Sequence, residues 1–504
     1  MSDSTKPGPI ELEIFRHLFA SIAEEMGSRL MRSAYSPNIK ERRDYSCALF
    51  DASGEMIAQA AHIPVHLGAA PASVRACLAA FDPSEMRAGD RFLLNDPFAG
   101  GTHLPDITVV QPCFLPGEAR PSFFVANRAH HADVGGISPG SMPLSTHIDQ
   151  EGIRVPPSRL DEALLDRICA ATRTGEERRG DLQAQMAALT VGVERLLRLC
   201  ERYGAALVRG CGSELLAYTE RMARAALAEF PAGEYRFEDL MDGDGFGARD
   251  VAIRCTLSLG PDDAVADFRE SDDQVRGPIN AVRAITVSAT TYVLLCLAPP
   301  YVPHNGGAAR AIDVRTREGS LLDARPPAAV AAGNIETSQR IVDVLLGAFA
   351  QAAPDRVPAA SCGSMNNVTI GGADPRRGRP FTYCETIAGG SGAAPAGDGA
   401  SGVHVHMTNT RNTPVEALEH AYPFRVTAYR LRNGSGGRGA HRGGDGISRI
   451  YAFDAEAEVT LLTERRTRGP YGLAGGSPGR AGQNVLVEPD GARKPLPGKC
   501  NLRV

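Results

Sequence analysis

The spacing of apolar residues predicts a chain that changes between helical and extended segments. In residues 10–36 apolar side chains recur every three or four positions, the spacing of one helix face, and Pro37 stops the pattern. Residues 44–59 form two strand-like runs around the turn sequence DASGE, which predicts a hairpin. Residues 90–98, 106–115 and 121–130 are also strand-like, and residues 71–83 predict a short helix between the hairpin and these strands.

The middle of the chain is predicted to be helical and the last third rich in strands and turns. Residues 158–230 repeat apolar positions at three and four, which indicates a helical hairpin or small bundle. Strand patterns return after residue 234, two helices follow at 281–297 and 337–354, and residues 457–466 form a clear strand. We therefore predict a mixed α+β fold whose N-terminal and C-terminal regions are β-rich. The expected regions are residues 1–155, 156–230, 231–353 and 354–504.

Composition narrows the class of protein. Of the 504 residues, 43% are hydrophobic and 22% charged, which is typical of a soluble globular chain. The net charge of −5 argues against a nucleic-acid-binding protein, which needs a basic face. No apolar run reaches the length of a membrane span, and the first 20 residues lack a signal core, so we expect a cytoplasmic protein. The 11 cysteines include no CxxC pair, which favours reduced thiols over a thiolate zinc site.

A group of histidines and carboxylates lies at or near predicted strand ends, where side chains from distant segments meet. Two imidazoles and two carboxylates make a mixed nitrogen and oxygen ligand set, which suits Zn, Mn or Fe and leaves room for water or substrate. The alternative is that Asp106 caps a turn and His130 is an ordinary buried histidine. Spacing alone leaves both the metal site and this alternative open. The residues concerned are Asp44, His103, Asp106, His130, His131 and Asp133.

Two glycine-rich stretches also draw attention. Residues 432–446, RNGSGGRGAHRGGDG, match neither nucleotide-binding glycine motif, so we expect tight turns there and no nucleotide site. In residues 383–419, Glu385 precedes a Gly-Gly pair, and His404 and His406 alternate as if on one strand face. So many polar groups in a glycine-rich run suggest a substrate-facing loop, with structural turns as the alternative.

Nine motifs spread along the chain can be compared with known families. They are NDPFAGGTHLPDITVVQP, HHADVGGISPGSMP, EGIRVPP, RGPINA, ETSQRIVDVLLGAF, MNNVTIGG, ETIAGGSGA, GVHVHMTNTRNTPVEALE and HRGGDG. Together they resemble the hydantoinase B family, and the resemblance covers residues 10–499. This family includes the B-type subunits of ATP-dependent hydantoinases and bacterial 5-oxoprolinases, and the corresponding subunits of acetone and acetophenone carboxylases.

The resemblance implies a division of labour between two subunits. A separate A-type subunit uses ATP to phosphorylate the substrate, and the B-type chain completes the reaction at one divalent transition metal, Zn, Mn or Fe. Carried over to this sequence, the ligands are Asp44, His103, Asp106 and His130, with His131 in reserve. The expected catalytic groups are Asp133 or His131, which would move a proton, and Glu385. We expect a dimer of heterodimers with the A-type subunit.

These observations lead to one expected function and two alternatives. The chain is expected to be the metal-bearing subunit of an ATP-dependent cyclic amidohydrolase that opens a 5-oxoproline-like or hydantoin-like lactam. The first alternative is a subunit of a ketone carboxylase of the acetone or acetophenone type, which could use the same ligands. The second is a non-catalytic scaffold that holds no functional metal and only positions the A-type subunit.

Overall fold

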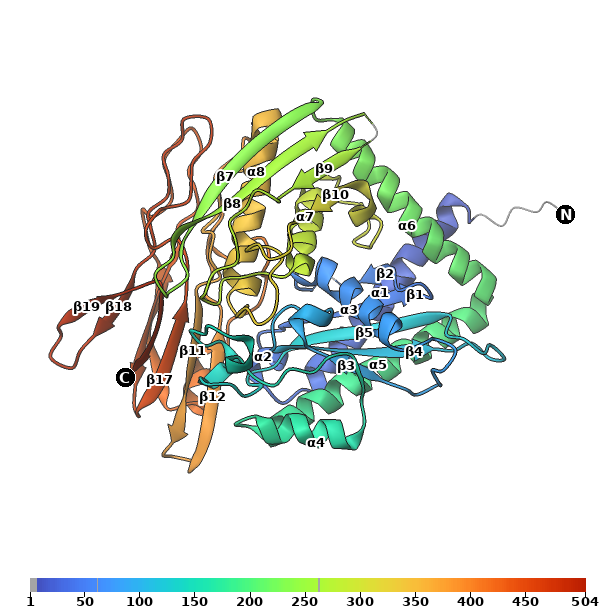
Figure 1. The fold of residues 1–504 in the computed structure, drawn as a ribbon, viewed down its shortest axis with the longest axis horizontal. Coiled ribbons are helices and arrows are strands. Elements are labelled where there is room, and N and C mark those ends of the chain that lie inside the picture. Colours follow the sequence, from blue (N-terminus) through green and yellow to red (C-terminus); the bar gives the residue numbers. More distant parts are fainter. Residues whose placement is uncertain (1–6, 61, 262) are drawn as a thin grey trace.

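A computed structural model of the chain describes residues 7–60, 62–261 and 263–504 (Figure 1). The fold is mixed α+β, as predicted from the sequence, and contains three main sheets. The first has six antiparallel strands in the order β2-β1-β5-β4-β3-β6. These are β1 (Tyr45–Asp51), β2 (Met56–Gln59), β3 (Phe92–Leu94), β4 (Asp106–Cys113), β5 (Phe123–His130) and β6 (Ser158–Arg159).

Both faces of the first sheet are covered by helices. Side chains alternate between the faces along each strand, so Leu49 and Val109 pack with Phe19 of α1, while Phe50 and Val110 pack with Val74 of α3. This double coverage explains why every residue of β4 is buried. The helices of the first face are α1 (Pro9–Ser33), α4 (Glu162–Ala171), α5 (Gly175–Tyr203) and α6 (Ala205–Ala228), and α3 (His66–Ala80) covers the second.

The second sheet packs against two buried helices in the centre of the molecule. Its order is β10-β9-β8-β7, with β9 and β10 parallel. A π-helix, η5 (Gly333–Thr337), runs directly into α8, and α8 is buried from Ser338 to Ala350. The elements are β7 (Gly233–Gly243), β8 (Arg249–Leu259), β9 (Ala264–Asp267), β10 (Asp313–Arg315), α7 (Arg283–Leu297) and α8 (Ser338–Ala352).

The third sheet carries the C-terminal strands and lies in the lower left of the view in Figure 1, next to the hairpin of residues 484–496. Its order is β12-β11-β17-β20, formed by β11 (Asn367–Asp374), β12 (Arg379–Glu385), β17 (Ala457–Leu462) and β20 (Lys499–Arg503). Three hairpins complete this region: β13 (Gly389–Gly390) with β14 (Ser401–Val403), β15 (Phe424–Leu431) with β16 (Ile447–Phe453), and β18 (Asn484–Val487) with β19 (Arg493–Leu496). The short helices α2 (Pro37–Lys40) and α9 (Val415–Ala421) also belong to the described elements.

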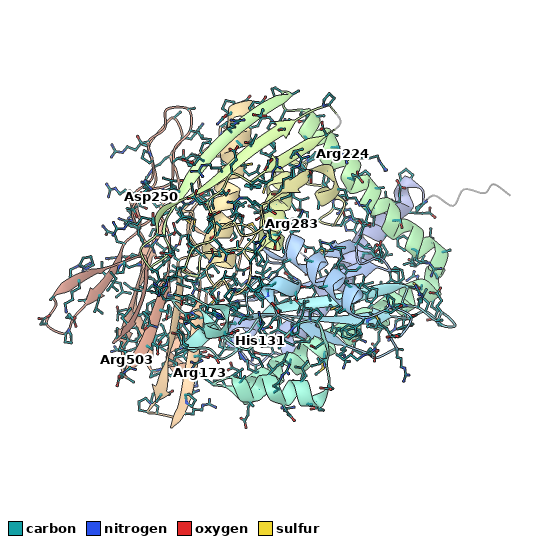
Figure 2. All side chains as sticks on the ribbon, in the orientation of Figure 1. His131, Arg173, Arg224, Asp250, Arg283 and Arg503 are labelled. Carbon is teal, nitrogen blue, oxygen red and sulfur yellow. The ribbon has the colours of Figure 1, made fainter. Side chains whose placement is uncertain are left out.

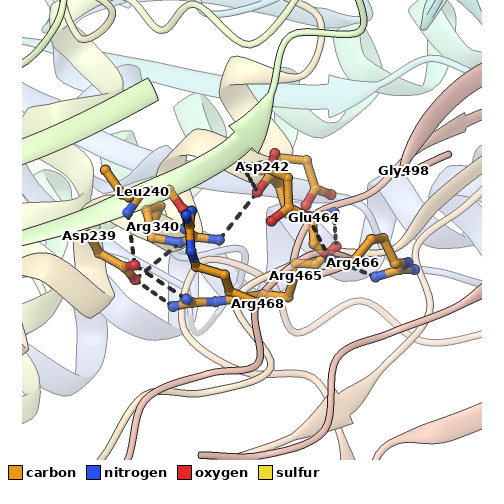
Figure 3. A network of polar contacts seen from close by, with 12 residues as sticks. Asp239, Leu240, Asp242, Arg340, Glu464, Arg465, Arg466, Arg468 and Gly498 are labelled. Atoms are coloured by element: carbon orange, nitrogen blue, oxygen red, sulfur yellow. Dashed lines mark hydrogen bonds and ion pairs between the residues drawn. The ribbon is translucent and has the colours of Figure 1, made fainter. Parts of the chain in front are cut away.

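A buried network of charges joins the third sheet to α8 and β7 (Figure 3). Arg340 of α8 lies 3.3 Å from Glu464, which follows β17 and also pairs with Lys499 of β20. Arg465 lies 2.7 Å from Asp239 of β7. The side chains of Arg340 and Glu464 are almost completely buried, so each charge depends on its partner.

Most of the predicted elements are present, and one is wrong. The N-terminal helix, the 44–59 hairpin, the helical segment and the strand at 457–466 appear as α1, β1–β2, α4–α6 and β17. The predicted strand through His404 and His406 is not found, because β14 ends at Val403 and His406 has a φ of +54°, a turn conformation. The largest hydrophobic core among the described residues draws side chains from all four predicted regions, from Ile63 in the first to Leu462 in the last. Among the described residues, no helix combines the length and apolar character that crossing a membrane requires.

Candidate metal centre

Two of the predicted ligands are brought together by strand pairing. Asp106 is the first residue of β4, His130 is the last residue of β5, and the two are direct partners in the antiparallel register. Direct partners project their side chains to the same face of a sheet. His130 Nδ1 therefore lies 3.2 Å from Asp106 Oδ1, at the ends of the two central strands of the first sheet.

The third predicted ligand comes from the loop before β4. Gly100 has a φ of +98°, and a Cβ at Gly101 would lie 2.5 Å from the backbone oxygen of Asn95, so glycine is needed for this turn. The turn directs His103 inward, with its Nε2 3.0 Å from Asp106 Oδ1. One ligand atom from each of His103, Asp106 and His130 lies within 4.8 Å of the others, and all three residues are buried.

Asp44, the fourth predicted ligand, is not part of this three-residue group, but it lines a small cavity that Asp106 and His130 also line. It immediately precedes β1, and its backbone oxygen accepts a hydrogen bond from the backbone nitrogen of His130 at 3.0 Å. Its carboxylate lies 3.6 Å from Arg42, whose guanidinium donates to the Cys384 carbonyl at 2.6 Å. The cavity shared by Asp44, Asp106 and His130 has a volume of about 20 Å³, enough for one water-sized occupant.

The electrostatics of the group centre on the buried carboxylate of Asp106. Burial would raise the pKa of Asp106, but the surrounding imidazoles, His103 first, hold it well below its usual value. Burial lowers the pKa of His130, but the hydrogen bond to Asp106 outweighs this and raises it to about 10. A carboxylate kept ionised beside two imidazoles is a donor set that suits a divalent transition metal, which would displace the imidazole protons.

His66 and Asn334 also contact the group, and sequence spacing gave no signal for either. His66, at the start of α3, places Nε2 3.3 Å from Asp106 Oδ2 and Nδ1 2.8 Å from Ser46 Oγ. Asn334, in the π-helix, places its amide nitrogen 3.0 Å from His103 Nε2. Both belong to elements far from the ligands along the chain, so only the tertiary structure could reveal them.

The three residues predicted as catalytic groups have other neighbours. His131, labelled in Figure 2, contacts α5 instead: its Nε2 lies 2.9 Å from Gln185 Oε1. The Asp133 carboxylate accepts from the Gly135 and Gly140 backbone nitrogens and pairs with Arg173 at 2.9 Å. These contacts hold the loop after β5, and the proton-transfer role expected for His131 or Asp133 stays a prediction.

Glu385, the third of these residues, ends β12 and is fully buried. Its carboxylate accepts from the Tyr451 hydroxyl at 2.6 Å and from the Asn412 amide at 2.8 Å, and it pairs with Arg449 at 3.1 Å. The next residue, Thr386, lines the cavity of the metal centre. Its expected catalytic role also stays a prediction.

The glycine-rich loop 432–446 is held by one of its own carboxylates. Asp445 accepts from the backbone nitrogens of Gly434 at 3.1 Å and Gly436 at 2.8 Å, and its Oδ1 also accepts from the Arg442 guanidinium at 2.7 Å. Backbone N–H groups of this kind could cradle a phosphate, but here an internal anion already uses them. The loop therefore fits the structural interpretation better than the nucleotide-binding one.

A buried carboxylate, Glu151, supports the segment that orients His103. Its Oε1 accepts from the backbone nitrogens of Val330 at 2.9 Å and Ala331 at 3.0 Å. The carbonyl of Ala331 lies 3.3 Å from His103 Nδ1, so an Nδ1–H donates there and leaves Nε2 facing Asp106. Burial raises the pKa of Glu151 from its usual 4.5 to about 7, although Ser145 and the two amides oppose this.

We expect Glu151→Gln to change how stability depends on pH. The folded chain holds the Glu151 proton more tightly than the unfolded chain, so wild-type stability should fall as pH rises from about 4.5 to 7. Glutamine resembles the protonated form and lacks this dependence. Urea unfolding should show similar stability of the two proteins at pH 5 and a more stable variant at pH 8. An equal difference at both pH values would contradict the assignment.

A six-stranded sheet with two histidines and a carboxylate gathered where its two central strands begin and end defines a candidate metal-binding fold. The chain belongs to the Hydantoinase B/oxoprolinase family, whose model matches residues 8–504. An uncharacterized protein of Methanocaldococcus jannaschii is 39% identical, over 98% of this chain and 87% of its own length. 5-Oxoprolinase 1 of Arabidopsis thaliana is 38% identical over 98% of this chain, but the chain spans only 40% of that protein.

A relative of similar length and two solved structures are also similar to this chain over most of its residues. The putative B-type subunit of a D-/L-hydantoinase from Pseudomonas sp. is 29% identical over 95% of this chain and 84% of its own length. The ATP-dependent caprolactamase from Pseudomonas jessenii has a similar structure, with a TM-score of 0.87 and 28% identity over 99% of this chain and 88% of that chain. Nucleotide-free acetone carboxylase, at 19% identity, TM-score 0.86, and coverage of 95% and 66%, shares the fold.

Proposed function

We propose that this chain is the metal-bearing component of an ATP-dependent cyclic amidohydrolase that opens a 5-oxoproline-like or hydantoin-like lactam. The observation that carries the proposal is the buried group of His103, Asp106 and His130, where β4 begins and β5 ends. The similarity to an ATP-dependent caprolactamase over nearly the whole chain supports a cyclic amide as the substrate class. An unactivated amide is a poor electrophile, which gives ATP a chemical purpose in such a reaction.

The ATP-dependent step is assigned to a separate partner chain of the A type. The hydantoinase relative is a B-type component, which implies an A-type counterpart, and the Arabidopsis 5-oxoprolinase is more than twice as long as the part that this chain matches. In the proposal, the partner phosphorylates the amide oxygen of the substrate and this chain carries out the second half of the reaction. Assembly as a dimer of heterodimers remains a prediction.

The residues of this chain would hold the metal and keep bulk water away. His103, Asp106 and His130 supply three ligands, and Asp44, on the wall of the same cavity, is the proposed fourth. When bound, a divalent metal supplies Lewis acidity and lowers the pKa of a coordinated water molecule. His66 holds the second oxygen of Asp106, so the carboxylate presents Oδ1 to His103 and His130.

The test is to purify the chain with its A-type partner and to follow three reactions in parallel. We expect ATP-dependent loss of 5-oxoproline or hydantoin, with ATP hydrolysis coupled to ring opening. The chain alone and the complex carrying His103→Ala serve as controls, and both should be inactive. ATP-dependent loss of acetone with bicarbonate instead would favour the carboxylase alternative. A metal-free complex that turns over none of the three would favour the scaffold.

A further inference from the structure

The buried asparagine Asn334 faces the candidate metal centre from the central helix. It belongs to the π-helix η5, which leads into α8, and it is 5% exposed. Its Nδ2 lies 3.0 Å from His103 Nε2 and 3.5 Å from Asp106 Oδ2. Single π-helical turns are uncommon and are found frequently at functional sites, because they redirect a side chain out of the regular helical pattern.

The two ends of the Asn334 amide have unequal surroundings. The nitrogen lies beside an imidazole nitrogen and a carboxylate, the same two groups that a metal at this centre would bind. The oxygen, Oδ1, is buried and has no hydrogen-bond partner within residues 7–60, 62–261 and 263–504. A half-turn of the amide exchanges the two ends with little change in shape. It would turn the unpartnered oxygen towards His103 and Asp106, which is the favourable orientation beside a cation.

The spacing of the atoms is that of neighbouring ligands on one metal. Ligand bonds of about 2.1 Å at octahedral or tetrahedral angles place adjacent donor atoms roughly 3.0–3.4 Å apart. The distances from Asp106 Oδ1 to His103 Nε2 and His130 Nδ1 are 3.0 and 3.2 Å. The amide end of Asn334 lies 3.0 Å from His103 Nε2, within the same range.

We propose that Asn334 is a further ligand of the metal, coordinating through its side-chain oxygen. This proposal rests on the metal site of the proposed function and adds to it a neutral oxygen donor. The ligand set then joins α8 to the first sheet, so that metal binding links the central helix to the ends of β4 and β5. The alternative role is a hydrogen-bond donor that only orients His103 and Asp106.

Two substitutions separate these roles. Asn334→Asp keeps an oxygen in place and adds a charge, so a ligand role predicts that metal affinity is kept or increased. A donor role predicts the opposite, because an ionised aspartate cannot donate and would repel Asp106. Asn334→Leu removes both functions at similar volume. Loss of a partner that only orients a ligand typically weakens metal binding by about 10-fold to 100-fold, and loss of a ligand should weaken it at least as much. Asn367→Leu is the matched control: Asn367 lines the same cavity, but its Oδ1 contacts Cys384 Sγ at 3.4 Å.

The measurement is titration of the metal-free full-length chain with Mn²⁺ and with Zn²⁺ by calorimetry, with electron paramagnetic resonance of the bound Mn²⁺ as a spectroscopic readout. Circular dichroism in the presence of chelator checks that each variant is folded. Kept affinity in Asn334→Asp, loss in Asn334→Leu and wild-type behaviour of Asn367→Leu are expected. Loss in both Asn334 variants, or in neither, overturns the ligand role.

The metal titration and the turnover assay test the role of Asn334 and the proposed function separately. Wild-type protein that binds metal but opens no lactam with its partner would remove the proposed function and leave the assignment of Asn334 standing. Turnover by a wild-type complex whose metal affinity is unchanged by Asn334→Leu would remove only the assignment. Wild-type protein that binds neither ion overturns the assignment of Asn334 together with the metal centre.

Discussion

The His103→Ala variant should lose its metal and its product formation while staying folded. His103 supplies one of about four ligands, and the remaining ligands cannot restore the geometry that a divalent transition metal needs. The fold should depend less on His103 than the metal does, because the hydrogen bond from its Nδ1 to the backbone carbonyl of Ala331 is 3.3 Å long, which is longer than usual. Elemental analysis should find roughly one metal ion per wild-type chain and almost none in the variant. The circular dichroism spectrum and complex formation with the partner should be largely kept.

Two further variants test the other ligands. One concerns the carboxylate of Asp106, and the other concerns which histidine at the end of β5 is the ligand. Asp106→Asn should resemble His103→Ala, because Asp106 is the residue that both imidazoles contact. His131→Ala should keep most of its metal, since that side chain points to Gln185 on α5. Full metal occupancy and normal turnover in His103→Ala would make His103 a turn residue and remove the centre of the proposal.

The Glu464→Ala variant should be the most destabilising of the changes outside the metal centre. Glu464 is fully buried, pairs with both Arg340 and Lys499, and accepts from the backbone nitrogen of Asp242 at 2.9 Å. Removing the carboxylate leaves two buried cations without their main partner, which typically costs about 3–5 kcal/mol. Thermal and urea unfolding should both show a large decrease in the midpoint, and the third sheet should separate from α8 first.

The matched control for Glu464→Ala is the exposed pair of Lys494 and Glu488 on the β18–β19 hairpin. Lys494 is 63% exposed, and exposed pairs of this kind contribute little because water screens them. Lys494→Ala should leave the unfolding midpoint unchanged within error. If Glu464→Ala behaves in the same way, the network of Figure 3 does not hold the third sheet in place.

Local sequence patterns determined the elements and part of the candidate site. Hydrophobic periodicity gave α1, the β1–β2 hairpin and the helical segment, because each element has a period that its own residues display. His103 and Asp106 are three residues apart and straddle the start of β4, so their proximity is also a local property. The prediction of a strand through His404 and His406 failed because alternation of two histidines does not distinguish a strand from a turn.

The rest of the candidate site was decided by tertiary structure. His130 and His131 are neighbours in sequence, but adjacent residues at a strand end point to opposite faces, so one meets Asp106 and the other meets α5. Which of the two histidines joins Asp106 depends on the strand register and on the helix that packs on each face of the sheet. Asn334 is 231 residues away from His103 in the sequence and contacts it from a π-helical turn, which no local sequence pattern predicted. Contacts of this kind depend on how whole layers pack, and that information is spread over the entire chain.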